Sequence, residues 1–350
     1  MKVAVGLSGG VDSTLSALLL KEQGHEVIGV TMALYNKTIP NLKIAGDACY
    51  GPEEKQDIKD VVAWCKAQGI KHYVVNLSDA YQKTVLKYFK ETYLSGATPN
   101  PCIVCNAGMK FGMLIDEAKK EIDFDAFATG HYARIEKCAE GAVLRRGADL
   151  KKDQSYFLYR LTQDQLARTI FPLGNYTKQQ VRAMAKERGL AVADKPDSQD
   201  FYAGDYTDLL DVKDKEGSVV LTTGKVLGKH KGFWHYTIGQ RKGLGIAYPE
   251  PLYVVGLDAH HNRVIVGTEK ETKRLSCEIV QPVWSVLVKS KEIKCLVKYR
   301  STGQLVPATA FEKENGLWQI DFETPQKSLA PGQSAVLYDG DVVLGGGFIK

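Results

Sequence analysis

Over the first 130 residues, short apolar runs alternate with longer stretches in which apolar residues recur at helical spacing. Alternating buried strands and amphipathic helices are typical of an α/β fold with a doubly wound parallel sheet. Such a sheet binds ligands at the carboxyl ends of its strands. The pattern predicts strands over 3–7, 26–34, 72–77 and 124–129, and helices over 13–23, 54–68 and 106–119.

The pattern changes twice further along the chain. From 153 to about 211 it is helical, including a helix over 178–188 that Gly189 ends. Beyond Gly217, short alternating segments separated by glycine and turn residues run to the last residue, as in small β domains. We expect a nucleotide-binding domain with a helical extension over 1–212, a small β domain over 213–272 and a barrel-like domain over 273–350.

Composition places the chain among ordinary globular proteins. It has 350 residues, of which 44% are hydrophobic, and its apolar runs are far shorter than the roughly 20 residues of a membrane span. A strand is predicted from residue 3, which leaves no room for a signal peptide. Seven cysteines, an odd number, suggest reduced thiols. We therefore expect a cytoplasmic protein with no membrane partner.

The net charge of +5 is unevenly distributed. Residues 217–249 contain no acidic residue, and their lysines and arginine lie among Phe233, Trp234, Tyr236 and Tyr248. Basic side chains between aromatic ones suit a phosphate backbone and exposed bases. They equally suit a solvated surface over an aromatic core, and both interpretations stay open at this point.

A glycine-rich loop lies between the first predicted strand and the first helix. Glycines and a helix N-terminus bring backbone N–H groups close to an anion. No lysine follows in the Walker position, which favours chemistry at the α-phosphate of ATP over transfer of the γ-phosphate. The loop consists of Gly6, Leu7, Ser8, Gly9, Gly10, Val11, Asp12 and Ser13.

A second motif is the sequence TPNPCIVCN at 98–106. Asn106 is predicted to cap the helix that follows, which would place Cys105 at a helix N-terminus and favour its thiolate. Cys102 and Cys105 are compatible with a redox pair, with part of a metal site and with two structural thiols. Gly130 and His131 follow the last predicted strand, near the expected ligand.

Taken together, these motifs resemble the tRNA-specific 2-thiouridylases along nearly the whole chain. Further matching segments are ATGHYARI at 128–135, KDQSYFL at 152–158, KPDSQDF at 195–201, TIGQRKGLGI at 237–246 and PGQSAVLYDGDVVLGGG at 331–347. The resemblance implies a pyrophosphate-loop domain followed by two β-rich domains. It also implies ATP with Mg²⁺, a tRNA recognised at the wobble uridine of its anticodon stem-loop, and a sulfur donor, either a persulfide carrier protein or sulfide.

The resemblance also assigns residues. Met32 and Gly130 would join the loop in binding ATP, and Cys105, Cys102 and Asp12 would be catalytic. The implied tRNA contacts are Asn100, Pro101, His131, Lys152, Asp153, Gln154, Lys298, Tyr299 and Gln333. In the implied mechanism, the uridine O2 attacks the α-phosphate, and sulfur then displaces AMP.

The chain departs from the family at one catalytic position. Tyr202 stands where the family has a cysteine in a Ser-Gln-x-x-Cys segment, while Cys102 stands where many relatives have aspartate. Two hypotheses follow. In one, Cys102 and Cys105 form the working pair. In the other, Cys102, Cys105 and Cys49 hold a [4Fe-4S] cluster whose open iron binds sulfide.

Two other functions compete with sulfur transfer. Another pyrophosphate-loop adenylating ligase would explain the loop at 6–13, but not the loop at 98–106 or the β-rich domains. A non-catalytic tRNA-binding relative would explain Tyr202, but would not need an intact nucleotide loop.

Overall fold

The computed structural model describes residues 1–36, 48–139, 141–197 and 200–350, so Ser198 and Gln199 of the KPDSQDF segment lie outside the described residues. The chain forms two compact units. The first consists of Met1–Val85, Pro101–Gly204 and Asp341–Val343, and the second of Leu86–Asn100, Asp205–Gly340 and Leu344–Lys350. The predicted domain boundaries at 212 and 272 stay predictions.

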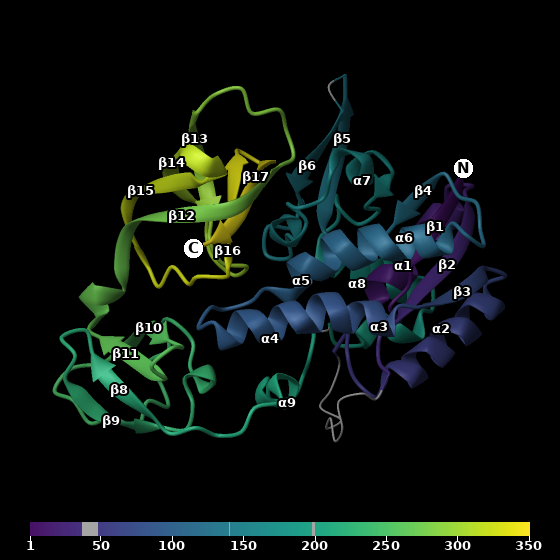
Figure 1. Ribbon diagram of the computed structural model, residues 1–350. Coiled ribbons are helices and arrows are strands. Elements are labelled where there is room, and N and C mark those ends of the chain that lie inside the picture. Colours follow the sequence, from purple (N-terminus) through teal and green to yellow (C-terminus); the bar gives the residue numbers. More distant parts are fainter. Residues whose placement is uncertain (37–47, 140, 198–199) are drawn as a thin grey trace. The chain divides into compact units, whose positions relative to one another are not determined.

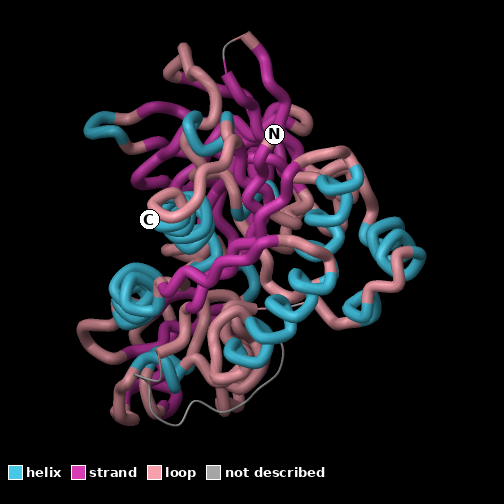
Figure 2. Tube along the Cα trace, turned by 90° about the vertical axis from the view of Figure 1, so that its right-hand side faces the viewer, coloured by secondary structure: helices cyan, strands magenta, loops and turns pink. Residues whose placement is uncertain are grey.

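The first unit contains the predicted parallel sheet. Its strand order is β3-β2-β1-β4-β7, and every neighbouring pair is parallel. The alternation of strand and helix along this part of the chain can be followed by label and colour in Figure 1, and Figure 2 shows the helices and strands in a view turned by 90°. The strands are β1 (Lys2–Gly6), β2 (Glu26–Ala33), β3 (Lys71–Asn76), β4 (Ala126–Ala128) and β7 (Thr169–Ile170).

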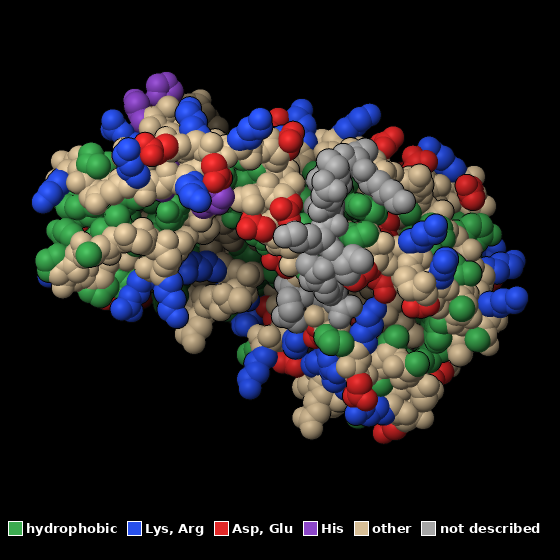
Figure 3. Space-filling model, turned by 90° about the horizontal axis from the view of Figure 1, so that it is seen from below, with side chains coloured by type: hydrophobic (Ala, Val, Ile, Leu, Met, Phe, Trp, Pro, Cys, Tyr) green, Lys and Arg blue, Asp and Glu red, His purple; other side chains and the backbone are tan. Residues whose placement is uncertain are grey.

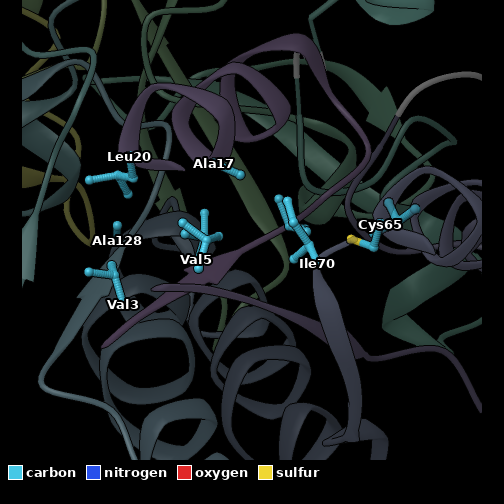
Figure 4. Close-up of a cluster of buried hydrophobic side chains, with 10 residues drawn as sticks. Val3, Val5, Ala17, Leu20, Cys65, Ile70 and Ala128 are labelled. Carbon is cyan, nitrogen blue, oxygen red and sulfur yellow. The ribbon is translucent and has the colours of Figure 1, made fainter. Parts of the chain in front are cut away.

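Two helices cross over between these strands, α1 (Val11–Glu22) and α2 (Glu54–Ala67). Val3 and Val5 of β1 pack with Ala17 and Leu20 of α1 in a fully apolar core (Figure 4). Cys65 of α2 is completely buried in the same cluster, so it is a core thiol. The four strands and two helices predicted for this region are confirmed to within two residues at every end.

The predicted helix over 106–119 is wrong at its start. The helical segment begins at Pro101 and runs through α5 (Pro101–Val104), the π-helix η2 (Cys105–Met113) and α6 (Leu114–Ala118). Proline suits a first helical position because its missing N–H would have no partner there. The buried Asn106 amide instead donates to the Phe157 carbonyl oxygen at 3.2 Å. Cys105 therefore lies inside the helical segment and not at its N-terminus.

The rest of the first unit was predicted only in part, because the sequence pattern gave no sign of a hairpin after β4. A hairpin of β5 (Ala133–Cys138) and β6 (Gly141–Arg146) follows β4. The helical region after residue 153 consists of short pieces and one predicted helix. They are η3 (Ser155–Phe157), α7 (Gln163–Ala167), α8 (Lys178–Glu187) and η4 (Ala191–Asp194).

The second unit begins with a helix that the sequence analysis missed, α4 (Lys87–Leu94), which follows α3 (Ser78–Tyr81) and η1 (Gln82–Leu86). The short helix α9 (Thr207–Leu210) belongs to the same unit. A four-stranded sheet follows, in the order β10-β11-β8-β9. Its strands are β8 (Gly217–Leu221), β9 (Val226–His230), β10 (Tyr253–Asp258) and β11 (Arg263–Gly267).

The last strands form a closed barrel, as predicted. They follow the order β12-β15-β14-β13-β16-β17, and β12 pairs with both β15 and β17. Trp318, Ile320 and Phe322 of β15 fill its interior. The strands are β12 (Lys273–Trp284), β13 (Glu292–Lys298), β14 (Val306–Glu312), β15 (Trp318–Lys327), β16 (Ser334–Asp339) and β17 (Val342–Ile349).

The structure also bears on the basic stretch at 217–249. Phe233 and Trp234 are buried, so these two aromatic side chains belong to the core, whereas Tyr248 is exposed. Figure 3, a view from below, shows lysine and arginine side chains spread over the visible surface with acidic side chains among them. For Phe233 and Trp234, the structure therefore agrees with the interpretation in which the aromatic side chains form a core beneath a solvated basic surface. Within the described residues, no helix is long and apolar enough to cross a membrane.

The barrel core gives a first prediction. Ile320 is fully buried, so Ile320→Ala should lower the free energy of unfolding by about 2–5 kcal/mol through lost burial and a residual cavity. Leu275→Ala, at a 57% exposed position of β12, is the matched control and should change it by less than about 0.5 kcal/mol. Urea unfolding followed by tryptophan fluorescence measures both. Equal effects of the two substitutions on the free energy of unfolding would contradict the placement of Ile320 in the barrel core.

Candidate functional site

The loop at 6–13 has the geometry of an anion site. Gly9 has a φ of +77°, a conformation that favours glycine, and Gly10 caps α1 without any side-chain hydrogen bond. The backbone N–H of Ser8 donates to Ser13 Oγ at 3.2 Å, which closes the turn. Because Gly10 has no side chain, it cannot cap the first N–H groups of α1. These groups lie at the positive end of the helix dipole.

Gly130 fixes the position of this loop. A Cβ at residue 130 would lie 2.6 Å from the Asp12 carbonyl carbon and 2.8 Å from the Ser13 nitrogen. Only glycine allows the chain after β4 to approach the first turn of α1 this closely. Met32, the other predicted ATP contact, is half-buried near the end of β2. The structure therefore brings Gly130 to the loop at the carboxyl edge of the sheet.

Asp12 is held by charged and polar neighbours that come from distant parts of the chain. The Lys178 ammonium lies 2.8 Å from each Asp12 carboxylate oxygen, and the Tyr132 hydroxyl donates to Oδ1 at 2.7 Å. Lys178 also lies 2.6 Å from Asp197, which Lys152 contacts at 2.8 Å. Burial works to raise the pKa of Asp197, but hydrogen bonds from Lys152 and Lys178 outweigh it and lower that pKa.

Three thiols are gathered in the same unit. Cys102 and Cys105 are half-buried, Cys49 is exposed, and each acts electrostatically on the buried Tyr81 hydroxyl. Burial raises the pKa of Cys102 to about 12 and that of Cys105 to about 11. The expectation that a helix N-terminus activates Cys105 is therefore wrong, because desolvation inside the helical segment outweighs it. The positive charge of Lys110 in η2 lowers the pKa of all three thiols, but by less than burial raises it.

The segment in which the family has its second cysteine lies beside Cys49. Ala48 forms a β-bridge with Asp200, and the Tyr50 N–H donates to the Phe201 carbonyl oxygen at 2.9 Å. Desolvation raises the pKa of Cys49, as it does that of Cys102, and the charge of Asp200 adds a smaller rise to both. Tyr202 is only 3% exposed, so its ring fills the interior at this position. The thiol of Cys49 therefore belongs to a loop that is bonded to the segment carrying Tyr202.

His131, three residues after β4, forms a cluster with two aromatic rings that also contact each other at 5.9 Å. Its ring centroid lies 5.8 Å from those of Phe111 and Phe171, and its Nδ1 is 2.7 Å from Thr129 Oγ1. Desolvation and the charge of Lys110 hold the pKa of His131 well below its usual range. At neutral pH this histidine is therefore uncharged.

The other predicted tRNA contacts differ in how accessible they are. Lys152 is 41% exposed and is able to reach a ligand. Asp153 is buried and accepts hydrogen bonds from Gly147 N, Ser155 N and Ser155 Oγ, so its carboxylate supports the local chain. Gln154 Oε1 accepts a hydrogen bond from Tyr132 N at 2.9 Å.

The remaining predicted contacts belong to the second unit, except Pro101, the first residue of α5. Gln333 Nε2 donates to the carbonyl oxygens of Thr98 and Pro99 at 3.1 Å and so supports the loop that carries Asn100. Asn100 and Lys298 are buried, and the Tyr299 hydroxyl donates to Gln326 Oε1 at 3.2 Å.

Sequence reasoning missed Lys178, Tyr132 and Asp197. Lys178 follows Asp12 by 166 residues, and its helix was predicted without any chemical role. Asp197 lies in the KPDSQDF segment, one of the motifs that carry the resemblance. The motif marked the segment as functional but did not identify this aspartate as part of the network around the loop.

Comparisons with known proteins cover the whole chain. Family models described as "tRNA methyl transferase HUP domain", "tRNA methyl transferase PRC-barrel domain" and "Aminomethyltransferase beta-barrel domain" match residues 1–202, 210–268 and 274–349. The chain is 46% identical to a tRNA-specific 2-thiouridylase MnmA of Endomicrobium trichonymphae and 42% identical to one of Acetivibrio thermocellus. Each alignment spans 100% of this chain and 99% of the relative.

Among solved structures, a 4-thiouridine synthetase in complex with RNA and bound ATP matches with a TM-score of 0.38 and 18% identity. That match covers 60% of this chain and 45% of the synthetase.

The close approach of Gly130 gives a second prediction. Gly130→Ala should weaken ATP binding by at least about tenfold, because the added methyl group displaces the Asp12 and Ser13 backbone. Gly51→Ala is the control, since a Cβ there meets nothing within 4 Å. Isothermal titration with ATP compares the two variants. Unchanged ATP affinity in Gly130→Ala would show that this contact does not shape the nucleotide site.

The raised thiol pKa values give a third prediction. Alkylation of Cys105 by iodoacetamide should keep rising with pH beyond 9, because burial raises the pKa of this thiol to about 11. Free cysteine, with a pKa of about 8.5, should level off earlier. Mass spectrometry of the alkylated peptide over pH 6–11 measures the profile. A plateau near pH 7 would indicate an activated thiolate and contradict the burial.

Proposed function

Because the chain belongs to the tRNA-specific 2-thiouridylase family, we propose that it replaces O2 of the tRNA wobble uridine by sulfur in an ATP-dependent reaction. In the first step, the uridine O2 attacks the α-phosphate of ATP and pyrophosphate leaves. In the second step, sulfur attacks C2 and AMP leaves with the former O2. The observation that carries the proposal is that the anion loop and three neighbouring thiols belong to one compact unit.

The loop supports binding of the nucleotide. N–H groups at the start of α1 would contact the pyrophosphate, and their dipole would stabilise the charge that develops as it leaves. Asp12 is a poor ligand for Mg²⁺ because Lys178 already contacts both of its carboxylate oxygens. No group of three or more metal-binding side chains is arranged to hold an ion within the described residues. We therefore propose that any Mg²⁺ arrives on the phosphates of ATP.

The thiols support two ways of holding sulfur. In the first, Cys105 carries a persulfide whose outer sulfur attacks C2. A neighbouring thiol then attacks the inner sulfur, forms a disulfide and releases the thiolated base. The electrons balance, because the outer sulfur of the persulfide gains the two electrons that are lost when the two cysteine sulfurs form the disulfide.

In the second way, Cys49, Cys102 and Cys105 would hold an iron–sulfur cluster. The electrostatic effect of Cys49 on both Cys102 and Cys105 supports a place for all three thiols around one cluster. Ligands of a multi-iron cluster lie farther apart than those of one ion, which is compatible with the absence of a single-ion site among the described side chains. Such a cluster would supply an iron that binds sulfide. We favour this arrangement because Cys49 lies beside the segment that lacks the family's cysteine.

The tRNA contacts are proposed on the resemblance and on accessibility. Lys152 is exposed enough to pair with a phosphate, and the neutral His131 suits contact with an uncharged base. The identity of the sulfur donor and the cytoplasmic location stay predictions. Two of the matching family models carry the name of a tRNA methyl transferase, but a pyrophosphate loop and clustered thiols suit adenylation and sulfur transfer better.

The central test mixes the protein with ATP, unmodified tRNA and a sulfur source, and analyses the nucleosides by mass spectrometry. Sulfide and a persulfide carrier protein are supplied in separate reactions to identify the donor class. We expect 2-thiouridine only when ATP is present. Methylated uridine, an aminoacylated or amidated product, or tRNA binding without any product would each contradict the proposal.

Thiol variants test how sulfur is held. Cys102→Ala and Cys105→Ala should each lower product formation at least about 100-fold, whereas Cys138→Ala, at an exposed position in β5, should leave it unchanged. Under the cluster arrangement, Cys49→Ala should also abolish activity, together with the iron and sulfide content after anaerobic reconstitution. Full activity of Cys49→Ala without bound iron would leave the persulfide pair as the correct arrangement.

A further inference from the structure

The loop at 6–13 carries an acidic residue where an anion is expected to bind. Asp12 lies in the first turn of α1, beside the N–H groups that would receive the pyrophosphate. A free carboxylate at this place would repel the phosphates, and the repulsion would be strong because the site is partly shielded from water. The loop itself contains no lysine that could compensate for it.

Lys178 supplies this compensation from another element. It is the first residue of α8, and its side chain is only 10% exposed. Its ammonium contacts both oxygens of Asp12 at 2.8 Å. A two-oxygen contact of this kind neutralises Asp12 more completely than a single surface ion pair would.

Four features hold Lys178 in this position. Its helix starts with a capping box in which Thr177 and Gln180 bond each other's backbone, and Asp149 accepts a hydrogen bond from the Lys178 N–H at 3.0 Å. Asp197 contacts the ammonium from a second direction at 2.6 Å. The ring of Tyr132 lies 5.6 Å from it.

The same contacts join the nucleotide loop to a predicted tRNA contact. Asp197 pairs with Lys178 at 2.6 Å and with Lys152 at 2.8 Å. Four side chains of alternating charge are therefore connected by ion pairs, from the loop to a partly exposed lysine. In order they are Asp12, Lys178, Asp197 and Lys152.

We propose that Lys178 is a positioning residue that neutralises Asp12 and thereby allows the loop to accept the pyrophosphate of ATP. It takes the electrostatic place of the lysine that a Walker loop carries within its own sequence, but it acts through Asp12 and from a helix that follows much later. This inference rests on the proposed use of ATP and does not depend on the later transfer of sulfur.

The test compares ATP with adenosine, which has no phosphate, as ligands in isothermal titration. Lys178→Met should weaken ATP binding at least about tenfold and adenosine binding less than about threefold, because only the polyanion meets the uncompensated charge. Lys178→Arg should recover most of the ATP affinity. Lys186→Met is the control on the same helix, where the lysine is exposed and pairs with Asp194, and it should bind both ligands normally.

A double variant separates compensation from packing. Asp12→Asn combined with Lys178→Met removes both charges, so it should bind ATP several-fold more tightly than Lys178→Met alone. It also serves as the test protein if Lys178→Met does not fold. Equal weakening of ATP and adenosine in Lys178→Met, or a double variant that binds ATP no better than Lys178→Met, would overturn the inference. If ATP binding behaves as expected while no 2-thiouridine forms, the proposed function fails and this inference stands.

Discussion

The contact between Gly130 and the first turn of α1 determines what the first unit can do. A side chain at residue 130 would overlap the backbone of Asp12 and Ser13, so β4 and the nucleotide loop meet only because glycine is present. The same approach brings the chain after β4 to the loop, including Tyr132, which donates to Asp12, and His131, which is neutral and clusters with two aromatic rings. Both the anion site and the groups beside it follow from one backbone contact.

The first unit keeps its charged side chains ionised and paired, whereas it keeps its buried thiols protonated and uncharged. Around Asp12, each charge has a partner of opposite sign, so the loop can face a polyanion without a free carboxylate. Around Cys102 and Cys105, burial keeps the thiols protonated at neutral pH. Such thiols are poor nucleophiles by themselves, which is why sulfur held as a persulfide or bound to iron suits this site better than attack by a free cysteine thiolate.

Much of the fold could be predicted because its strands are short, fully apolar and separated by amphipathic helices. Val3 and Val5 of β1 are completely buried, and such residues give the strongest sequence signal. The start of the helix at Pro101 could not be chosen, since Pro101 and Asn106 are both good starting residues and only the buried contact of Asn106 with Phe157 decides between them. A π-helix such as η2 has no comparable pattern.

The candidate site was predicted less completely for a related reason. The loop residues and Gly130 are local motifs, but the pairing of Asp12 with Lys178 joins residues far apart in the sequence and has no periodic signature. The neighbourhood of Cys49 and Asp200 likewise depends on a bridge between two loops. Tyr202 in place of the cysteine expected from the resemblance, and Cys49 as a possible cluster ligand, were visible in the sequence, whereas the contact between their two segments became evident only from the fold.

The most direct measurement follows the oxygen atom that sulfur replaces. A tRNA that carries a heavy oxygen isotope at O2 of its wobble uridine would be converted in the presence of ATP and a sulfur source, and the released nucleotide would be analysed by mass spectrometry. Attack of O2 on the α-phosphate predicts that the heavy oxygen appears in the phosphate of AMP. Its appearance in water, or its retention in the thiolated tRNA, would contradict the account.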